Sequence, residues 1–310
     1  MIVKNTKRSP LFYVGDKYKV IDQIKILIPE KIDVWVEPFL GGGSSAMNIT
    51  ANSFILNDFD KNVINIHKYL FKNSGKKIEF FRRIKKDIEK FGLSSSFFDI
   101  NMPTKILKDE FPKTYYSVLN KKSYIKLKEK FNLNKKIDLL YLLLVYGFNH
   151  MIRFNSSSQF NLPVGNVDFN NTTARALNWY FDWVNENKTQ IEFYCMDYKN
   201  FLEESILSKY KSEEVFIFLD PPYLISKSEY NKFWDEGKEK ELYEFLDLLN
   251  SKGYKFGITN LSIHKGKQNI FFEKWRSKYI SKILKSNFIS SHNNSIKNSE
   301  EIFVTNYEKY

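Results

Sequence analysis

The chain has a single cysteine, Cys195, and only four histidines, which are scattered among its 310 residues. One thiol excludes a disulfide framework. No Cys/His cluster has the spacing of a zinc site, so we expect no structural metal. No segment approaches the ~20 consecutive apolar residues that a membrane span needs. Residues 1–10 are polar and basic and lack the apolar segment of a secretory signal. These absences favour a protein of the reduced cytoplasm.

Acidic side chains are also fewer than basic ones, with 36 Asp and Glu against 48 Lys and Arg, which gives a formal net charge of +12. Such a balance favours polyanionic partners, nucleic acid above all. Charge that serves only solubility is the alternative. The basic pairs are densest between residues 74 and 136. Because 43% of the residues are hydrophobic, the chain is expected to form a globular protein with a proper core.

The hydrophobic pattern predicts an α/β fold. Apolar runs predict strands at 34–36, 54–56, 191–194, 215–219, 254–258 and 302–304. Helical spacing predicts helices at 20–28, from 45 onward, at 137–146 and at 242–249, the last capped by Gly253. Residues 75–175 have a helical and loop-like pattern without strong strands. We therefore expect one α/β domain, residues 1–74 plus 176–310, with a mainly helical insertion at 75–175.

The strongest chemical signal is Asp220-Pro221-Pro222-Tyr223, directly after the apolar run at 215–219. Ligand sites in open α/β sheets lie at the carboxyl ends of strands. Two prolines remove two N–H donors, so the Asp220 carboxylate and main-chain carbonyls form a corner rich in acceptors. Such a corner suits an exocyclic amino group, and Tyr223 offers a flat face on which a base can stack. An ordinary proline-rich turn is the alternative.

A second signal is Glu37-Pro38-Phe39-Leu40-Gly41-Gly42-Gly43-Ser44, at the tip of the first strand. Its glycines let the backbone approach a ligand closely, and Asp58 after the next strand is placed to accept hydrogen bonds from ribose hydroxyls. Upstream, the segment from Tyr13 to Lys17 by itself predicts a loop with a surface lysine. The loop Phe148–Asn171 combines Arg153 with amides and apolar tips, which suits base reading as well as a polar surface.

Taken together, these motifs resemble the Dam-type N6-adenine DNA methyltransferases over nearly the whole chain, above all those of T-even bacteriophages. The stretches 220–234, 255–267 and 301–307 add to the resemblance. It implies a Rossmann-like S-adenosylmethionine-dependent methyltransferase sheet, with residues 75–175 as a DNA target-recognition domain. It also implies methyl transfer from S-adenosylmethionine to adenine in double-stranded DNA, with GATC as the expected target. We expect a monomer or weak dimer; a cognate restriction endonuclease is an open partner.

The resemblance implies a role for each motif residue. The catalytic residues would be Asp220, Pro221, Pro222 and Tyr223. The cofactor-binding residues would be Tyr13, Lys17, Glu37, Pro38, Phe39, Gly41, Gly42, Gly43, Ser44, Asp58, Asp197, Tyr198 and Asp220. The DNA-contacting residues would be Phe148, Asn149, Met151, Arg153, Asn155 and Pro163. Departures from the family are Phe12 in place of a lysine, Asn166-Val167 in place of basic residues, and a longer insert, and they bear on the target sequence.

These roles imply a mechanism in which the adenine is flipped out of the duplex. Asp220 and the Pro221 carbonyl accept the two N6 hydrogens while Tyr223 stacks on the base, and basic residues of the insert meet phosphates. No covalent adduct with the base is required, so Cys195 is expected to be a buried structural residue. A cytosine-N4 methyltransferase and a non-catalytic DNA-binding relic of the family are the alternatives.

Overall fold

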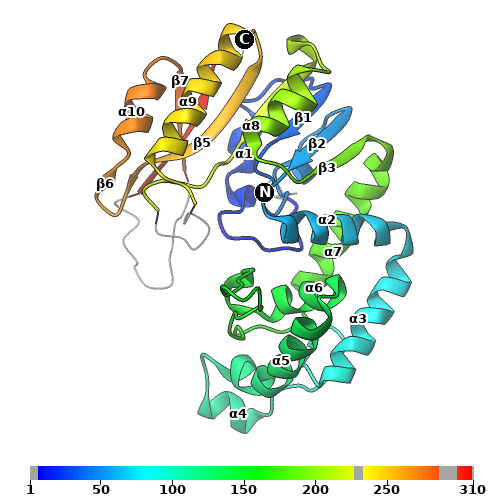
Figure 1. Ribbon diagram of the computed structural model, residues 1–310. Helices are drawn as coiled ribbons and strands as arrows, with labels where there is room; N and C mark the ends of the chain where they lie inside the picture. The colour runs from blue at the N-terminus through cyan, green and yellow to red at the C-terminus, as the bar shows by residue number, and fades with distance from the viewer. Residues whose placement is uncertain (1–5, 227–232, 286–298, 309–310) are drawn as a thin grey trace, which may run out of the picture.

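The computed structural model describes residues 6–226, 233–285 and 299–308; residues 227–232 of the stretch 220–234 lie outside these ranges. Eight strands in these ranges form one sheet of order β3-β2-β1-β4-β5-β8-β7, with β6 paired to β5 (Figure 1). The strands are β1 (Val34–Glu37), β2 (Ser53–Asn57), β3 (Ile191–Tyr194), β4 (Val215–Leu219), β5 (Lys255–His264), β6 (Lys267–Gln268), β7 (Ile280–Leu284) and β8 (Ser299–Thr305). Strands β1 to β5 are parallel, and β8 is antiparallel to both β5 and β7.

The central strands are apolar on both faces because helices cover both faces of the sheet. Side chains alternate between faces along a strand, so Val36 and Ile217 pack on one side, and Trp35 and Phe218 on the other. The first side is covered by α8 (Tyr198–Phe201), α9 (Glu236–Ser251) and α10 (Ile270–Arg276). The second is covered by α1 (Ile21–Lys25), α2 (Lys61–Asn73) and α7 (Asn171–Asn187).

A helical region follows α2 and lies below the sheet in Figure 1. It contains α3 (Lys77–Phe91), α4 (Lys105–Glu110), α5 (Tyr115–Asn134) and α6 (Ile137–Tyr146). Every residue of α6 from Leu139 to Tyr146 is buried, and α6 belongs to the same hydrophobic core as Trp35 and Phe218 of the sheet. The helical region is therefore anchored on the sheet through a shared core, and α7 leads the chain back to β3.

The predicted α/β class is confirmed, and β3, β4 and α6 have the predicted bounds. Three expectations were wrong. Helix α1 is shorter than 20–28, and only a 3₁₀ turn at Ala46–Asn48 follows the glycine turn. Cys195 is exposed, because it follows β3, the strand at the edge of the sheet. The domain boundary at 175 stays a prediction, and α7 runs across it. Within the described ranges, none of the helices is both long and apolar enough to cross a membrane.

Candidate active site

The glycine loop follows β1 and packs against an N-terminal segment. Gly41 and Gly43 have φ of +48° and +75°, values that favour glycine. A Cβ on Gly42 would lie 3.0 Å from the Tyr13 Cβ, so the absence of a side chain permits this close approach. Ser44 Oγ accepts a hydrogen bond from the Ser9 amide at 2.9 Å. The sequence motif therefore forms a tight loop with Tyr13 against it.

Two side chains fix the position of Gly41: Asp58, which follows β2, and His67 of α2. Asp58 Oδ2 accepts the Gly41 amide at 2.8 Å, and its Oδ1 accepts the Asp60 amide at 2.8 Å. His67 Nε2 lies 2.9 Å from the Gly41 carbonyl, and its Nδ1 lies 3.0 Å from the Tyr180 hydroxyl. Burial lowers the pKa of His67 to about 4. His67 is therefore neutral at pH 7, and it donates from Nε2, because a carbonyl only accepts.

Glu37 is a buried carboxyl at the carboxyl end of β1, with 1% of its surface exposed. The Trp35 indole donates to its Oε2 at 3.0 Å. Burial raises the pKa of Glu37 to about 8, and the negative charge of nearby Asp220 adds to the effect. Burial likewise raises the pKa of Asp58, to about 6. These two acids make the loop a site that gains from a bound cation.

Asn57 joins the ends of three adjacent strands. Its amide group donates to the Pro38 and Met196 carbonyls at 2.9 and 3.0 Å, and its oxygen accepts the Met196 amide at 2.9 Å. The next residue, Asp197, caps α8 by accepting the Lys199 amide at 3.0 Å. The loops after β1, β2 and β3 are thus held side by side, which places Asp197 near the glycine loop.

An aromatic cluster lies beside Asp197. The Phe39 ring is 5.3 Å from that of Tyr198 and 5.8 Å from that of Trp234. The Tyr198 side chain is buried, and its hydroxyl has no hydrogen-bond partner among the described residues. A buried hydroxyl without a partner is costly. A ligand that supplies a polar atom here would remove that cost.

The Asp220-Pro221-Pro222-Tyr223 motif begins one residue after β4, next to the end of β1. Asp220 Oδ2 lies 2.8 Å from Lys17 Nζ. Its Oδ1 accepts hydrogen bonds from the Tyr223 hydroxyl at 2.9 Å and from Thr259 Oγ1 at 2.7 Å. Glu301 of β8 completes the group, since it accepts the Tyr223 hydroxyl at 2.8 Å. We call these five residues the catalytic corner: Lys17, Asp220, Tyr223, Thr259 and Glu301.

Lys17 is a buried member of this corner, with 6% of its side chain exposed. The expectation of a surface lysine, drawn from its local sequence, was therefore wrong. Burial alone would lower the pKa of Lys17, but the charges of Asp220 and Glu301 outweigh this effect and raise it. Lys17 is therefore an ammonium that compensates two carboxylates, Asp220 after β4 and Glu301 of β8. No local sequence pattern reveals this pairing.

The predicted recognition loop forms a hairpin-like segment between α6 and α7, far from the motif residues in sequence. Isolated bridges join Gly147 to Val164 and Phe154 to Phe160. A Cβ on Gly165 would meet the Gly147 carbonyl at 2.8 Å, so the two backbones are in close contact. The Phe148 amide donates to the Pro163 carbonyl at 2.9 Å. The loop is thus an ordered element.

Its predicted DNA-contacting side chains differ in exposure. Phe148 is 49% exposed, whereas Met151 is partly buried against the core. Arg153 donates to the side chain and the carbonyl of Asn161 at 2.9 and 3.0 Å, which fixes its guanidinium on the hairpin. Asn155 turns the tip by accepting two backbone amides. Asn149 has a positive φ of 52°.

Three contributors to the site were not predicted from the sequence: His67, Thr259 and Glu301. Thr259 and Glu301 lie in the stretches 255–267 and 301–307 that add to the resemblance, but no local pattern gives them a role in the site. Each of the three contacts a residue that is distant in the chain. In the ranges 6–226, 233–285 and 299–308, acidic, histidine and cysteine side chains form no group of three that could hold a metal ion.

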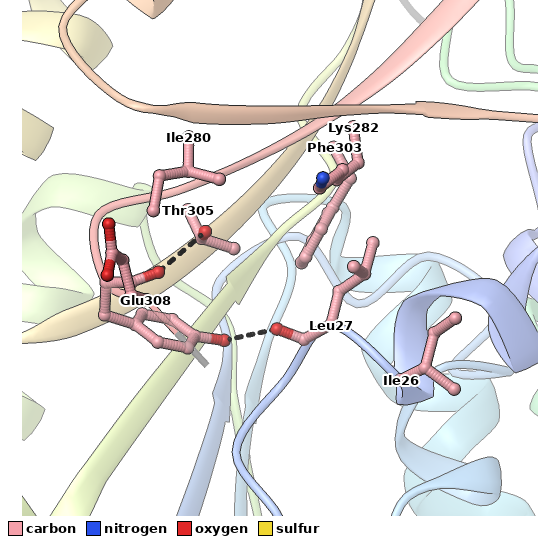
Figure 2. A pocket seen from close by; sticks show the side chains of 8 residues that line it. Ile26, Leu27, Ile280, Lys282, Phe303, Thr305 and Glu308 are labelled. Atoms are coloured by element: carbon pink, nitrogen blue, oxygen red, sulfur yellow. Dashed lines mark hydrogen bonds between the residues drawn. The ribbon is translucent and has the colours of Figure 1, made fainter. Parts of the chain in front are cut away.

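A separate hollow of about 420 Å³ lies between α1 and the β7–β8 pair, as Figure 2 shows. Ile26, Leu27 and Ile280 contribute apolar surface to it, and the Tyr307 hydroxyl donates to the Leu27 carbonyl at 2.9 Å. None of its lining residues belongs to the glycine loop, the Asp220 motif or the predicted recognition loop. It is therefore distinct from the site at the carboxyl ends of β1 and β4.

Comparison with known proteins agrees with these motifs. Residues 13–301 match the model of the D12 class of N6 adenine-specific DNA methyltransferases. The chain is 31% identical to the type II methyltransferase M.FokI of Planomicrobium okeanokoites, over 98% of this chain and 43% of that protein. It is 29% identical to the modification methylase StsI of Streptococcus sanguinis, over 99% and 44% of the two chains. The chain is 26% identical to a DNA adenine methylase of Haemophilus influenzae, over 72% of this chain and 66% of that protein. The chain spans less than half the length of the first two relatives.

Proposed function

Because the chain belongs to the D12 class of N6 adenine-specific DNA methyltransferases, we propose that it transfers a methyl group from S-adenosylmethionine to the N6 atom of adenine in double-stranded DNA. The observation that carries the proposal is the adjacency of two loops. Strands β1 and β4 are paired and parallel, so the glycine loop and the Asp220 motif leave the sheet at the same edge. The electrostatic effect of Asp220 on Glu37 agrees with this proximity.

The residues of the glycine loop fit S-adenosylmethionine. Its amino group and its sulfonium carry positive charge against one carboxylate, so the cofactor has a net positive charge. This edge has more acidic side chains than ammonium groups: Glu37, Asp58, Asp220 and Glu301 against Lys17. Tyr13, Lys17 and the residues from Glu37 to Ser44 would hold the amino-acid part, Asp58 the ribose, and Asp197 with Tyr198 the adenine. When bound, the cofactor supplies a methyl group on a sulfonium, which is a good leaving group.

The chain's own residues bind and orient the adenine and the DNA. A flipped adenine costs a few kcal/mol to unstack, and stacking on Tyr223 offsets part of it. Asp220 and the Pro221 carbonyl accept the two N6 hydrogens, which localises the nitrogen lone pair. Phe148, Asn149, Met151, Arg153, Asn155 and Pro163 would contact the DNA through the hairpin, while basic residues of the insertion meet phosphates. GATC is the first target sequence to test. A partner restriction endonuclease would make methylation of the target a protection against cleavage.

Replacement of Asp220 by Ala tests the proposal. Methyl transfer should be lost while the affinities for S-adenosylmethionine and DNA are largely retained, measured by transfer of labelled methyl groups and by binding titrations. Asp22→Ala, at a carboxylate that is 53% exposed on α1, is the matched control and should methylate normally. A near-normal rate for Asp220→Ala contradicts the mechanism. Detection of N6-methyladenine in sequenced DNA from cells that express the chain would identify the target.

A further inference from the structure

Glu301 is a buried carboxylate of the catalytic corner that the mechanism above does not use. It lies on β8 opposite Leu261 of β5, and its side chain is 2% exposed. Its Oε1 accepts the Tyr223 hydroxyl at 2.8 Å and lies 3.5 Å from Lys17 Nζ. A buried carboxylate is costly unless donors satisfy it. These two donors therefore explain how the corner accommodates a second carboxylate.

The Tyr223 hydroxyl has two carboxylates within hydrogen-bond distance, Glu301 at 2.8 Å and Asp220 at 2.9 Å. A hydroxyl has one proton to donate, so only one carboxylate receives it at a time. Lys17 has three protons and three acceptors: the Gly15 carbonyl at 2.7 Å, Asp220 at 2.8 Å and Glu301 at 3.5 Å. Tyr223 can thus move its hydrogen bond from Asp220 to Glu301 without losing a partner.

Asp220 has about four acceptor sites, and three donors already face them in this arrangement. Its Oδ1 faces the hydroxyls of Tyr223 and Thr259, and its Oδ2 faces Lys17. An amino group needs an acceptor that is open along its N–H direction. When the Tyr223 hydroxyl turns fully to Glu301, such a position opens on Asp220 Oδ1.

We propose that Glu301 is a positioning residue for methyl transfer, which holds the Tyr223 hydroxyl and shares the charge of Lys17 while Asp220 binds the adenine amino group. The inference rests on the proposed function. It explains why a buried acid lies on β8, next to β5, within reach of both donors. It also predicts that the effect of Glu301 on the rate depends on the Tyr223 hydroxyl.

The first test is the single-turnover rate of methyl transfer by Glu301→Ala. We expect a loss of about 10- to 100-fold, the size of effect that a misplacement of about 1 Å can produce. The dissociation constants for S-adenosylmethionine and DNA should change little. Glu301→Gln keeps an acceptor for the Tyr223 hydroxyl and should restore most of the rate. Glu300→Ala is the matched control, one residue away on β8, and should have the wild-type rate.

A double-mutant cycle with Tyr223→Phe then separates positioning from a merely structural role. The loss caused by Glu301→Ala should largely disappear when the hydroxyl is absent. Equal losses in both backgrounds, a wild-type rate for Glu301→Ala, or weakened binding of both ligands would each overturn the inference. If the alanine variant does not fold, Glu301→Asp replaces it, because a shorter carboxylate withdraws from Tyr223 and should lose rate in the same way.

The wild-type chain distinguishes failure of this inference from failure of the proposed function. A wild-type chain that binds DNA but methylates none would overturn the proposed function, and this inference with it. If the wild-type chain is active but the rate losses of Glu301→Ala and Tyr223→Phe simply add in the double mutant, only the role of Glu301 is overturned.

Discussion

Binding of S-adenosylmethionine should expel a proton from Glu37. This carboxyl is 1% exposed, and burial raises its pKa to about 8. The free protein at neutral pH therefore holds Glu37 mostly as the neutral acid. The cofactor's amino-acid part carries an ammonium, and a cation beside a carboxyl favours the ionised form. Cofactor binding and ionisation of Glu37 are thus linked.

The magnitude follows from the pKa. At pH 7 an acid with a pKa of about 8 is about 90% protonated, so its full ionisation on binding releases about 0.9 proton. Asp58, with a pKa of about 6, is already about 90% ionised at pH 7 and adds only about 0.1 proton. The linkage also sets the sign of the pH dependence. Below pH 8 the contribution of Glu37 makes the affinity rise with pH, by roughly tenfold per unit at most.

Isothermal titration calorimetry in two buffers of different ionisation enthalpy measures the released protons directly. The wild-type chain should release close to one proton at pH 7, and Glu37→Gln should release almost none and bind more weakly. 5′-Methylthioadenosine, which lacks both the amino-acid part and the sulfonium charge, should release few protons from the wild-type chain. If Glu37→Gln releases as many protons as the wild type, the linkage does not involve Glu37 and the reasoning is refuted.

Other variants test the recognition hairpin and the glycine loop. Arg153→Ala should relax sequence choice by about 1–3 kcal/mol at one base pair, and unchanged rates on DNA substrates that differ at one position would remove Arg153 from base reading. His67→Phe removes the donor to the Gly41 carbonyl and should weaken cofactor binding but not DNA binding, as titrations of both ligands would show. Gly42→Ala should weaken cofactor binding, because the new Cβ would lie 3.0 Å from the Tyr13 Cβ. Gly75→Ala is the control and should bind the cofactor normally, because a Cβ there has no atom within 4 Å. Equal affinities of the two glycine variants would contradict that steric argument.

The parallel strands could be predicted because they are buried on both faces. The run at 215–219 is apolar at every position, and all five of its residues are buried in β4. Strand β7 has no such pattern, since Ile280 and Ile283 are exposed at 36% and 63%. Its conformation depends on the antiparallel pairing with β8. Helix α10 also escaped prediction, because its seven residues bury only Phe272 and Trp275.

The candidate site was predictable where its residues are adjacent in sequence, as in the glycine loop and the Asp220 motif. Contacts between distant segments were not. His67 reaches Gly41 across 26 residues, and Tyr223 reaches Glu301 across 78. The local sequence around Lys17 is that of a polar loop, and only the carboxylates of β4 and β8 make its burial tolerable. Such pairings arise from the strand order, which a short motif does not encode.

Phe12 joins the hairpin to the N-terminal segment that carries Tyr13 and Lys17. A φ of +50° is unusual for a bulky residue and persists only where the surroundings hold it. Its ring lies 5.0 Å from that of His150 in the hairpin and 4.7 Å from the Arg8 guanidinium. The hairpin therefore packs at Phe12 against the segment that carries Tyr13, one residue later, and Lys17. Phe12, the residue that departs from the family's lysine, thus lies at the junction between the hairpin and the N-terminal segment.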